Sequence, residues 1–273
     1  LIKGLVGGIL LGVGSAFAGG CNVGGFYTAF SAMSLSALTM MIGLFIGAYV
    51  GLKYLYWEME HLESGAVPSR STTSGVDWTK FQPYIGAALI IVTFAASELY
   101  AAEGFIILGG LLLCGTAFGF ILHRSRLCFA RCFREPFMTG ESDLTRAVIL
   151  SILVSLLGFA TLKWVGLRAE TAFVASNFGI GGILGGFIFG FGMIIAGGCG
   201  SGTVWRAAEG QIKLVLALIM FILSNSLTRA LTDASPAVQS FIGVQVYLPD
   251  YLGYQFSLIA ITALMLAWYV WVL

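Results

Sequence analysis

Charged residues are scarce in this sequence: they make up 10% of its 273 residues, whereas 58% of the residues are hydrophobic. A soluble domain carries roughly a quarter charged residues, because its surface must face water. So little charge leaves no polar surface for a soluble fold, and the composition predicts an integral membrane protein. The formal net charge is only +1, so the chain offers no basic face for phosphates and we expect no nucleic-acid partner.

The sequence also lacks several chemical signatures. It contains no Gly-x-x-x-x-Gly-Lys-Ser/Thr loop, which argues against ATP-driven transport by this chain. Its five cysteines are odd in number and lie in or beside apolar segments, a placement that fits no extracellular disulfide framework. The first apolar run is not followed by a small-residue cleavage site, so we expect it to belong to the mature protein rather than to a signal peptide.

Apolar runs of about 20 residues, the length that crosses a bilayer, recur along the chain. They predict an all-α, polytopic membrane protein with about eight or nine transmembrane helices plus broken or re-entrant half-helices, built as a single membrane domain over residues 1–273. The runs lie at 4–20, 35–56, 83–100, 104–122, 145–163, 181–198, 212–231 and 252–272.

Three other segments do not fit a full crossing. The shorter apolar pieces near 171–180 and 236–248 are expected to form interfacial or half-spanning helices. The stretch 57–82 is the one soluble-looking, polar segment, and its composition indicates a linker loop with no chemistry of its own.

An internal repeat organises the chain. Residues 7–29 and 185–207 align without gaps, and ten positions are identical: Gly7, Gly8, Gly12, Gly14, Ala18, Gly19, Gly20, Cys21, Gly24 and Ala29. Many transporters build a site at the bilayer midplane from such repeats. We expect one repeat over about 4–163 and the other over about 181–273. Each copy contains a Gly-Gly-Cys segment that would break a helix. If this break interrupts a single membrane crossing, the two copies have opposite orientations. If the chain instead forms a hairpin there and returns to its own side, the copies are parallel; we favour the inverted arrangement.

Each copy ends its first apolar run in Ala-Gly-Gly-Cys, and a further glycine follows three residues after the cysteine. The motif residues are Gly19, Gly20, Cys21 and Gly24 in one copy and Gly197, Gly198, Cys199 and Gly202 in the other. Paired glycines break a helix, and hydrocarbon tolerates the freed backbone groups only where the break is buried or lines a cavity. A helix that restarts near the last glycine would direct free N–H groups into that cavity. The motif predicts an anion site beside a thiol, the alternative being two packing kinks.

A third group of residues surrounds two more cysteines. Cys128 and Cys132 would share one face of a helix, and the neighbouring side chains are basic, among them Arg126 and Arg131. The spacing suggests a metal or a redox pair, but no second pair of soft ligands is evident, so we expect no metal and no cofactor. Nearby arginines would favour the thiolate form of the cysteine. Cys114, among leucines, is expected to be a small buried hydrophobic residue.

The stretch 123–147 is the densest basic cluster in the chain. The positive-inside rule therefore predicts that it lies on the cytoplasmic side of the membrane. Part of this stretch is also a candidate to dip into the membrane.

Together these motifs resemble the YeeE/YedE family of sulfur transporters. The resemblance is carried by the two Gly-Gly-Cys segments, by Arg-x-x-Leu-Cys-Phe at 124–129, and by Trp205-Arg206-Ala207-Ala208-Glu209-Gly210. It extends from residue 4 to about 231 and is weakest in the stretch 57–82 and beyond 232. Cys114 and Cys132 are not part of the family pattern.

The resemblance implies uptake of thiosulfate, or in some relatives another sulfur or selenium species, across the inner (cytoplasmic) membrane. It further implies an hourglass of helices with a central plug of loops, in which the ion passes between Cys21, Cys128 and Cys199 through hydrogen bonds to the thiols. Arg126, Arg131 and Arg206 are then candidates to attract the anion at the mouths, although Arg206 and Glu209 could instead form a structural salt bridge.

Two further functions remain open at the level of sequence. In the first, the chain is a membrane sulfur-transferase whose cysteines pass persulfide sulfur to a soluble TusA-type sulfur carrier. In the second, it is a non-transporting membrane subunit of a sulfur-metabolising complex. We favour the permease, and so expect a transporter rather than an enzyme.

Overall fold

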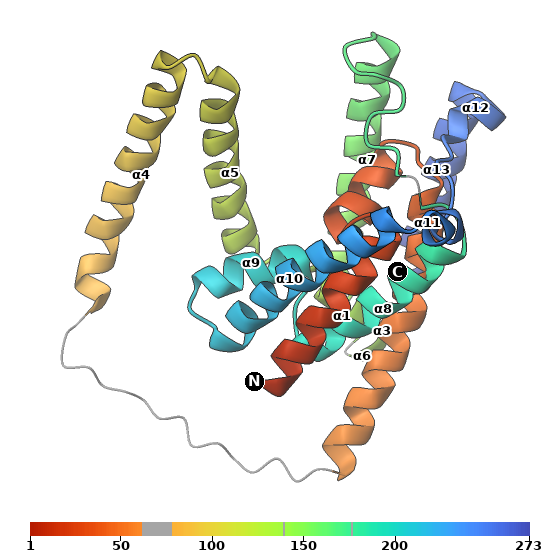
Figure 1. The fold of residues 1–273 in the computed structure, drawn as a ribbon, viewed down its shortest axis with the longest axis horizontal. Helices are drawn as coiled ribbons and strands as arrows, with labels where there is room; N and C mark the ends of the chain where they lie inside the picture. The colour runs from red at the N-terminus through yellow and green to blue at the C-terminus, as the bar shows by residue number, and fades with distance from the viewer. Residues whose placement is uncertain (62–77, 139, 176) are drawn as a thin grey trace. The chain divides into compact units, whose positions relative to one another are not determined.

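The computed structural model describes residues 1–61, 78–138, 140–175 and 177–273, and within these ranges it contains helices and no strand (Figure 1). Eight helical stretches in the described part are long and apolar enough to cross a membrane, which confirms the predicted all-α, polytopic architecture. The elements are α1 (Ile2–Ala18), the π-helix η1 (Asn22–Thr28), α2 (Ala29–Ser31), α3 (Ser36–His61), α4 (Trp78–Ala102), α5 (Ile106–Ser125), α6 (Phe129–Met138), α7 (Asp143–Trp164), α8 (Ile180–Ala196), α9 (Gly200–Ala208), α10 (Ile212–Ala234), α11 (Pro236–Ile242), α12 (Leu248–Leu252) and α13 (Tyr254–Trp271).

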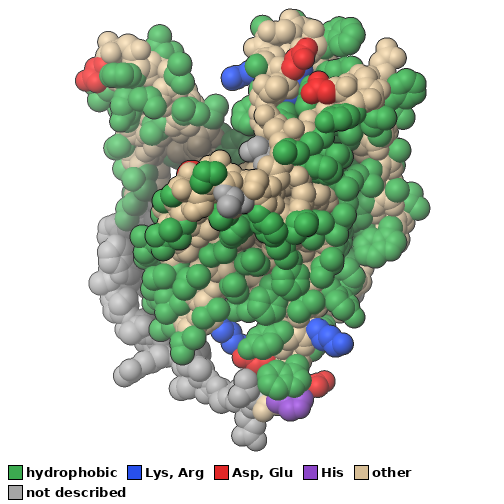
Figure 2. Space-filling view, turned by 45° about the vertical axis from the view of Figure 1, so that its right-hand side comes forward, with side chains coloured by type: hydrophobic (Ala, Val, Ile, Leu, Met, Phe, Trp, Pro, Cys, Tyr) green, Lys and Arg blue, Asp and Glu red, His purple; other side chains and the backbone are tan. Residues whose placement is uncertain are grey.

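The helices fall into two compact units. The larger unit comprises Leu1–His61 and Leu127–Leu273, and the smaller comprises Leu62–Arg126. In the smaller unit, α4 and α5 pack against each other, and the hydroxyl of Ser97 donates to the carbonyl of Gly109 at 3.4 Å. Figure 2 shows hydrophobic side chains over most of the visible face, with charged side chains mainly at its ends. This distribution is expected of a protein whose middle part contacts the hydrocarbon core of a bilayer.

The predicted segment boundaries need three corrections. The expected linker at 57–82 is shorter, because α3 continues to His61 and α4 begins at Trp78; residues 62–77 lie outside the described residues. The expected helix at 171–180 is wrong: the described residues there form turns and an isolated antiparallel bridge between Phe178 and Val244. The expected short helix at 236–248 is instead α11, which ends at Ile242.

Glycines hold α1 and α8 in close antiparallel contact. A Cβ atom placed on Gly7 would lie 2.6 Å from the backbone nitrogen of Ala196, and one on Gly14 would lie 2.5 Å from the backbone nitrogen of Phe189. Because residue numbers rise along α1 as they fall along α8, the two helices run in opposite directions. Small residues permit this close backbone contact, and the van der Waals packing it provides is one of the forces that associate helices in lipid.

Each of these two central helices carries one outer helix. On α8, a Cβ on Gly186 would lie 2.5 Å from the carbonyl oxygen of Met40 in α3. On α1, the equivalent position Gly8 meets Ala217 in α10. Helix α3 therefore packs on α8 as α10 packs on α1, and each outer helix runs parallel to the central helix it contacts. This is the arrangement expected of two copies related by a two-fold axis.

A buried lysine binds the backbone at the C-terminal end of α2. Lys163 in α7 is 4% exposed, and its ammonium group donates to the carbonyls of Ala32 at 2.9 Å and Glu170 at 2.7 Å. It also lies 4.5 Å from the ring centroid of Tyr247. Burial raises the pKa of Tyr247 to about 12, so the phenol stays neutral beside the cation. A cation at this position also suits the negative C-terminal end of the η1–α2 segment.

The contact between α1 and α8 yields a stability prediction. Replacing Gly14 by Ala should lower the free energy of unfolding by about 1–3 kcal/mol, because the added methyl group meets the backbone of α8 and the helices must separate. The matched control is Gly158→Ala in α7, where an added Cβ has no neighbour within 4 Å. Thermal unfolding in detergent and the monodisperse yield measure both effects. Equal melting temperatures for the two variants would contradict the close packing.

Candidate functional site

Both Gly-Gly-Cys segments break their helices with the same backbone geometry. Gly19 and Gly197 adopt left-handed conformations, with φ of 78° and 83°, that glycine reaches without strain. Cys21 and Cys199 then adopt extended conformations, with φ of −79° and −83°. A new helix begins directly after each cysteine, at Asn22 of η1 and at Gly200 of α9. The restart is therefore two residues earlier than the sequence suggested.

Side chains from outside each broken helix bind the carbonyls that the break frees. The amide of Asn177 donates to the carbonyl of Phe17 at 2.8 Å. At the equivalent position of the second copy, the ammonium group of Lys213 donates to the carbonyl of Ile195 at 3.3 Å. Each break thus meets the requirement that buried backbone groups find partners, with an amide on one side and a cation on the other.

The three predicted cysteines each precede a short helix. The carbonyl of Cys21 accepts from the N–H of Gly25 at 2.8 Å, and that of Cys199 accepts from the N–H of Thr203 at 2.8 Å. In α6 the carbonyl of Cys128 accepts from the N–H of Cys132 at 3.2 Å. All three cysteines therefore stand at helix N-termini, where free N–H groups and the helix dipole favour negative charge.

The structure brings Cys128 and Cys199 together. Their Sγ atoms are 3.7 Å apart, and the two side chains are 1% and 0% exposed. The Sγ atom of Cys199 also accepts from the N–H of Gly202 at 3.3 Å and lies 3.4 Å from the hydroxyl of Ser201. The start of α9 thus surrounds the thiol of Cys199 with hydrogen-bonding partners. The thiol of Cys128 comes from outside the aligned segments 7–29 and 185–207.

Two glycines of α9 make room for this grouping. A Cβ on Gly202 would lie 2.8 Å from Sγ of Cys128 and 3.2 Å from Sγ of Cys199. A Cβ on Gly200 would lie 3.3 Å from Cβ of Cys21, so the first break reaches the second. All three cysteines therefore lie around the N-terminus of α9. Gly24 differs from its equivalent, Gly202: it is exposed, and an added Cβ would meet nothing within 4 Å.

Aromatic side chains hold two of the short helices against each other. Phe26 and Phe133 each stand five residues after a site cysteine, and their ring centroids are 5.5 Å apart at an interplanar angle of 68°. Trp268 of α13 stacks on Phe133 at 6.0 Å, and Phe45 of α3 meets Phe133 edge-on at 5.1 Å. These contacts favour a single relative position of η1 and α6.

The three arginines predicted to attract the anion differ in their contacts and in the unit to which they belong. Arg206 donates to the carbonyl of Gly197 at 3.1 Å and lies over the ring of Trp205, so it supports the second break. Arg131 pairs with Glu135 at 2.6 Å, one turn along α6. Arg126 belongs to the smaller unit, which ends at this residue.

The remaining two cysteines differ in exposure. Cys132 is 1% exposed in α6, and no group of three or more His, Cys, Asp or Glu side chains suited to a metal occurs among the described residues. Cys114 was expected to be buried, but it is exposed on α5 of the smaller unit. A cysteine among leucines can face lipid as readily as a protein core, which is why composition misplaced it.

Sequence reasoning missed one polar residue at the centre of the site. Asn22 is 1% exposed and its amide nitrogen lies 3.6 Å from Sδ of Met193, while its Oδ1 has no partner among the described residues. Buried polar atoms normally find a hydrogen-bond partner, so Asn22 offers an unused group beside Cys21. The signal was present in the sequence, because Asn22 is the polar residue next to the first cysteine where the second copy has Gly200.

The separation of the two thiols is directly testable. Mild oxidation with diamide should join Cys128 to Cys199, because closing the gap to about 2 Å requires only a small side-chain movement. Peptide mapping by mass spectrometry should find this linkage, and Cys128→Ala should abolish it. A linkage from Cys132 to Cys199, or full retention of both free thiols, would contradict the geometry.

Comparison with known proteins identifies relatives of this chain. Residues 1–50 and 124–273 match the family described as sulphur transport. A protein named "Probable transporter YedE" from Escherichia coli K12 is 29% identical over 218 residues, which cover 78% of this chain and 52% of that protein. "Thiosulfate transporter TsuA" of the same organism is 34% identical over 125 residues, 46% of this chain and 35% of that protein.

A "Thiosulfate transporter TsuA" from Spirochaeta thermophila is similarly 33% identical over 119 residues, 44% of this chain and 36% of that protein. The chain thus spans about half the length of the YedE relatives and about a third of the TsuA relatives. No solved structure matches it significantly. The family match extends beyond residue 232, farther than the motifs indicated, and leaves out 51–123. Because the match covers most of the chain and includes all three site cysteines, the protein belongs to the sulphur-transport family, the YeeE/YedE family that its motifs resemble.

Proposed function

We propose that this protein is a permease that takes up a small sulfur-containing anion, with thiosulfate favoured, across the inner membrane through Cys21, Cys128 and Cys199. The observation that carries the proposal is the convergence of three cysteines, each at a helix N-terminus, around the start of α9. The names of the TsuA relatives, which call those proteins thiosulfate transporters, support the choice of substrate.

The physical argument begins with the cost of moving an anion through hydrocarbon. A charge without compensating donors is prohibitively expensive there. Backbone N–H groups at the starts of α6 and α9, with the thiols, can replace part of the ion's water. Thiols are weak donors, and conduction needs binding that is weak enough to allow release. A path lined by thiols therefore suits passage better than a path lined by strong donors.

The antiparallel contact between α1 and α8 supports an inverted relation between the two copies. We propose that the repeats extend over about 4–163 and 181–273 of a single membrane domain, with the segments that follow the two breaks meeting near the middle of the membrane. The face that carries the N-terminus of α1, with Lys3, and the start of α7, with Arg146, would be cytoplasmic under the positive-inside rule. The anion would then enter from the opposite face and leave toward these cations.

A second function is favoured by one observation, the 3.7 Å separation of the Cys128 and Cys199 sulfur atoms. Two thiols at this distance suit thiol–disulfide exchange. In this alternative the protein is a membrane sulfur-transferase that accepts a sulfane sulfur as a cysteine persulfide and passes it to a TusA-type carrier. The two functions differ in whether a covalent sulfur intermediate forms on the protein.

Single substitutions test the path. Changing Cys21, Cys128 or Cys199 to Ala should reduce uptake of radiolabelled thiosulfate into proteoliposomes at least about tenfold, since a weak donor is lost where the ion has no water. The folded yield should remain near that of the unchanged protein. Cys114→Ala is the matched control and should transport normally. If Cys114 proves essential while Cys199 is dispensable, the assignment of the path is wrong.

A serine substitution separates conduction from sulfur transfer. Cys199→Ser keeps a hydrogen-bond donor but makes it stronger and harder, so we expect low flux with a normally folded protein. The unchanged protein, quenched during uptake and analysed by mass spectrometry, should carry no added sulfur. A stoichiometric gain of one sulfur atom on Cys21, Cys128 or Cys199 would instead establish the transferase.

A further inference from the structure

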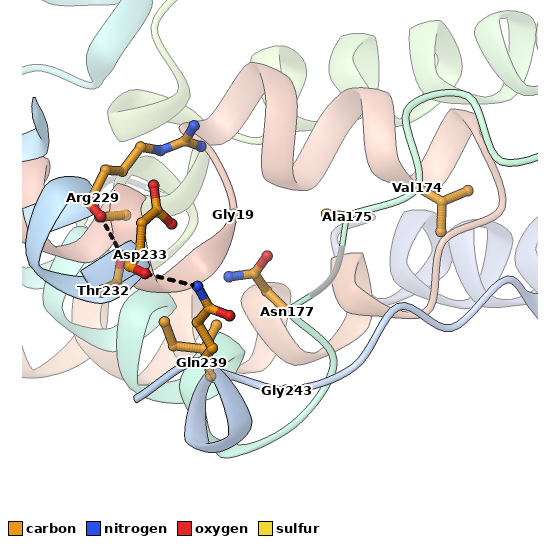
Figure 3. Close-up of a pocket in the computed structure, with 11 residues that line it drawn as sticks. Gly19, Val174, Ala175, Asn177, Arg229, Thr232, Asp233, Gln239 and Gly243 are labelled. Carbon is orange, nitrogen blue, oxygen red and sulfur yellow. Dashed lines mark hydrogen bonds between the residues drawn. The ribbon is translucent and has the colours of Figure 1, made fainter. Parts of the chain in front are cut away.

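A polar cavity of about 520 Å³ lies between the end of α1 and the end of α10 (Figure 3). Its walls include Gly19 of the first break and, from α10 and α11, Arg229, Thr232, Asp233 and Gln239. Two other cavities in the described part, of about 260 and 450 Å³, are lined mostly by apolar side chains. The polar cavity, which we call the interfacial cavity, therefore suits an occupant with a polar part.

The interfacial cavity lies at the depth of the lipid headgroups. Helix α10 is long and apolar enough to cross a membrane, and residues 214–228, between Lys213 and Arg229, carry no charge. At 1.5 Å per residue, α10 rises about 24 Å from one cation to the other, a little less than the hydrocarbon thickness of about 30 Å. Long cationic side chains extend from such positions toward the headgroups. Arg229 therefore marks one edge of the hydrocarbon region, and the cavity lies beside it.

Two opposite charges face the interfacial cavity without pairing. Arg229 and Asp233 stand about one helical turn apart in α10, a spacing that brings side chains within reach of each other. Among the described residues, neither side chain forms an ion pair. The amide of Gln239 donates to the backbone carbonyl of Asp233 at 3.3 Å and leaves the carboxylate free (Figure 3). A cation and an anion are therefore both available to one ligand.

Toward the middle of the membrane, α10 continues this side with an apolar surface. Ile222 lies two turns before Arg229 on the same side of the helix and is 54% exposed. Ile219, about one turn further, is 45% exposed. Only 11% of the spanning window of α10 is buried inside the protein. A ligand whose polar end fills the cavity can therefore lay an apolar part along α10.

We propose that the interfacial cavity binds the headgroup of an ethanolamine phospholipid, with an acyl chain along α10. The lipid phosphate accepts from the guanidinium of Arg229, which presents several donors in one plane. The primary ammonium group donates to the carboxylate of Asp233. A choline headgroup is cationic but has no N–H to donate, and a glycerol headgroup leaves Asp233 facing a net anion. The pair of charges therefore selects ethanolamine over both.

Lipid titration followed by native mass spectrometry tests the proposal. The delipidated protein in detergent is titrated with phosphatidylethanolamine, phosphatidylglycerol and phosphatidylcholine that carry identical chains. The unchanged protein should hold one phosphatidylethanolamine molecule about tenfold more tightly than either other lipid, because only this headgroup satisfies both charges. Arg229→Gln should weaken its binding about tenfold, and Arg229→Lys should weaken it less, since lysine keeps the charge but loses the planar set of donors.

Asp233→Asn should reverse a preference rather than remove binding. Without the carboxylate the cavity carries one net positive charge, so phosphatidylglycerol should bind at least as tightly as phosphatidylethanolamine. A misfolded variant would not gain affinity for one lipid. The matched controls are Arg168→Gln and Asp250→Asn, which change exposed residues that do not line the cavity. Both should keep the lipid preference of the unchanged protein.

Three results would overturn the proposal. These are equal affinities of the unchanged protein for the three lipids, equal effects of Arg229→Gln and Arg168→Gln, and an unaltered ethanolamine preference in Asp233→Asn.

A soluble occupant is tested with glycerophosphoethanolamine, the same headgroup without acyl chains, and with inorganic phosphate. Each should displace the lipid only at concentrations at least about a hundredfold higher, because neither covers the apolar surface of α10. If either competes as well as the lipid, the cavity binds a soluble phosphate compound and the lipid proposal is wrong. The permease proposal stands or falls separately, since lipid binding involves none of the three site cysteines.

Discussion

The structure depends on one constraint, the need of every backbone N–H and C=O group in hydrocarbon to find a partner within the protein. Two helices of this chain are broken inside the membrane domain, at Gly19 and at Gly197. Each break frees carbonyls behind it and N–H groups in front of it. The carbonyls are held by Asn177, Lys213 and Arg206. In front of each break a new helix begins, and Cys21 and Cys199 stand at the N-termini of these two helices.

Glycine packing places the two breaks at opposite ends of the contact between α1 and α8. Close antiparallel contact between α1 and α8 sets their relative positions along the helix axes, so the segments that follow each break turn back toward each other. Cys21 then meets Gly200, one residue after Cys199. A single bulky residue in this contact would separate the breaks as well as the helices. Stability and the geometry of the candidate site therefore depend on one interface in this protein.

The two copies have diverged in ways that suit an asymmetric task. Asn22 in one copy corresponds to Gly200 in the other, and the first copy restarts as a π-helix where the second forms an α-helix. π-helical turns often occur at functional sites. The third thiol, Cys128, precedes α6, outside the aligned segments 7–29 and 185–207. Along the proposed path, an ion would meet the amide of Asn22 and the thiol of Cys21, and separately the close pair of thiols of Cys128 and Cys199.

Much of the fold and part of the site followed from the sequence. Eight apolar runs predicted the spanning helices, and the repeated Gly-Gly-Cys segment predicted two breaks, because glycine at the end of an apolar run readily adopts the left-handed conformation that ends a helix. The weaker predictions rested on short segments: 171–180 is apolar, but its described residues before α8 form turns and, at Phe178, a bridge to Val244. Local composition cannot anticipate a partner that comes from a distant segment.

The sequence by itself determined the membrane class and the family resemblance, and it singled out three cysteines. Only the tertiary structure decided which thiols meet, because the 3.7 Å separation of Cys128 and Cys199 joins segments 71 residues apart. It also decided that Arg206 supports a backbone carbonyl while Arg229, which no motif marked, faces a cavity. Sequence specifies the chemistry of each side chain, but its partners depend on helix packing, and in this chain glycine contacts between helices set that packing.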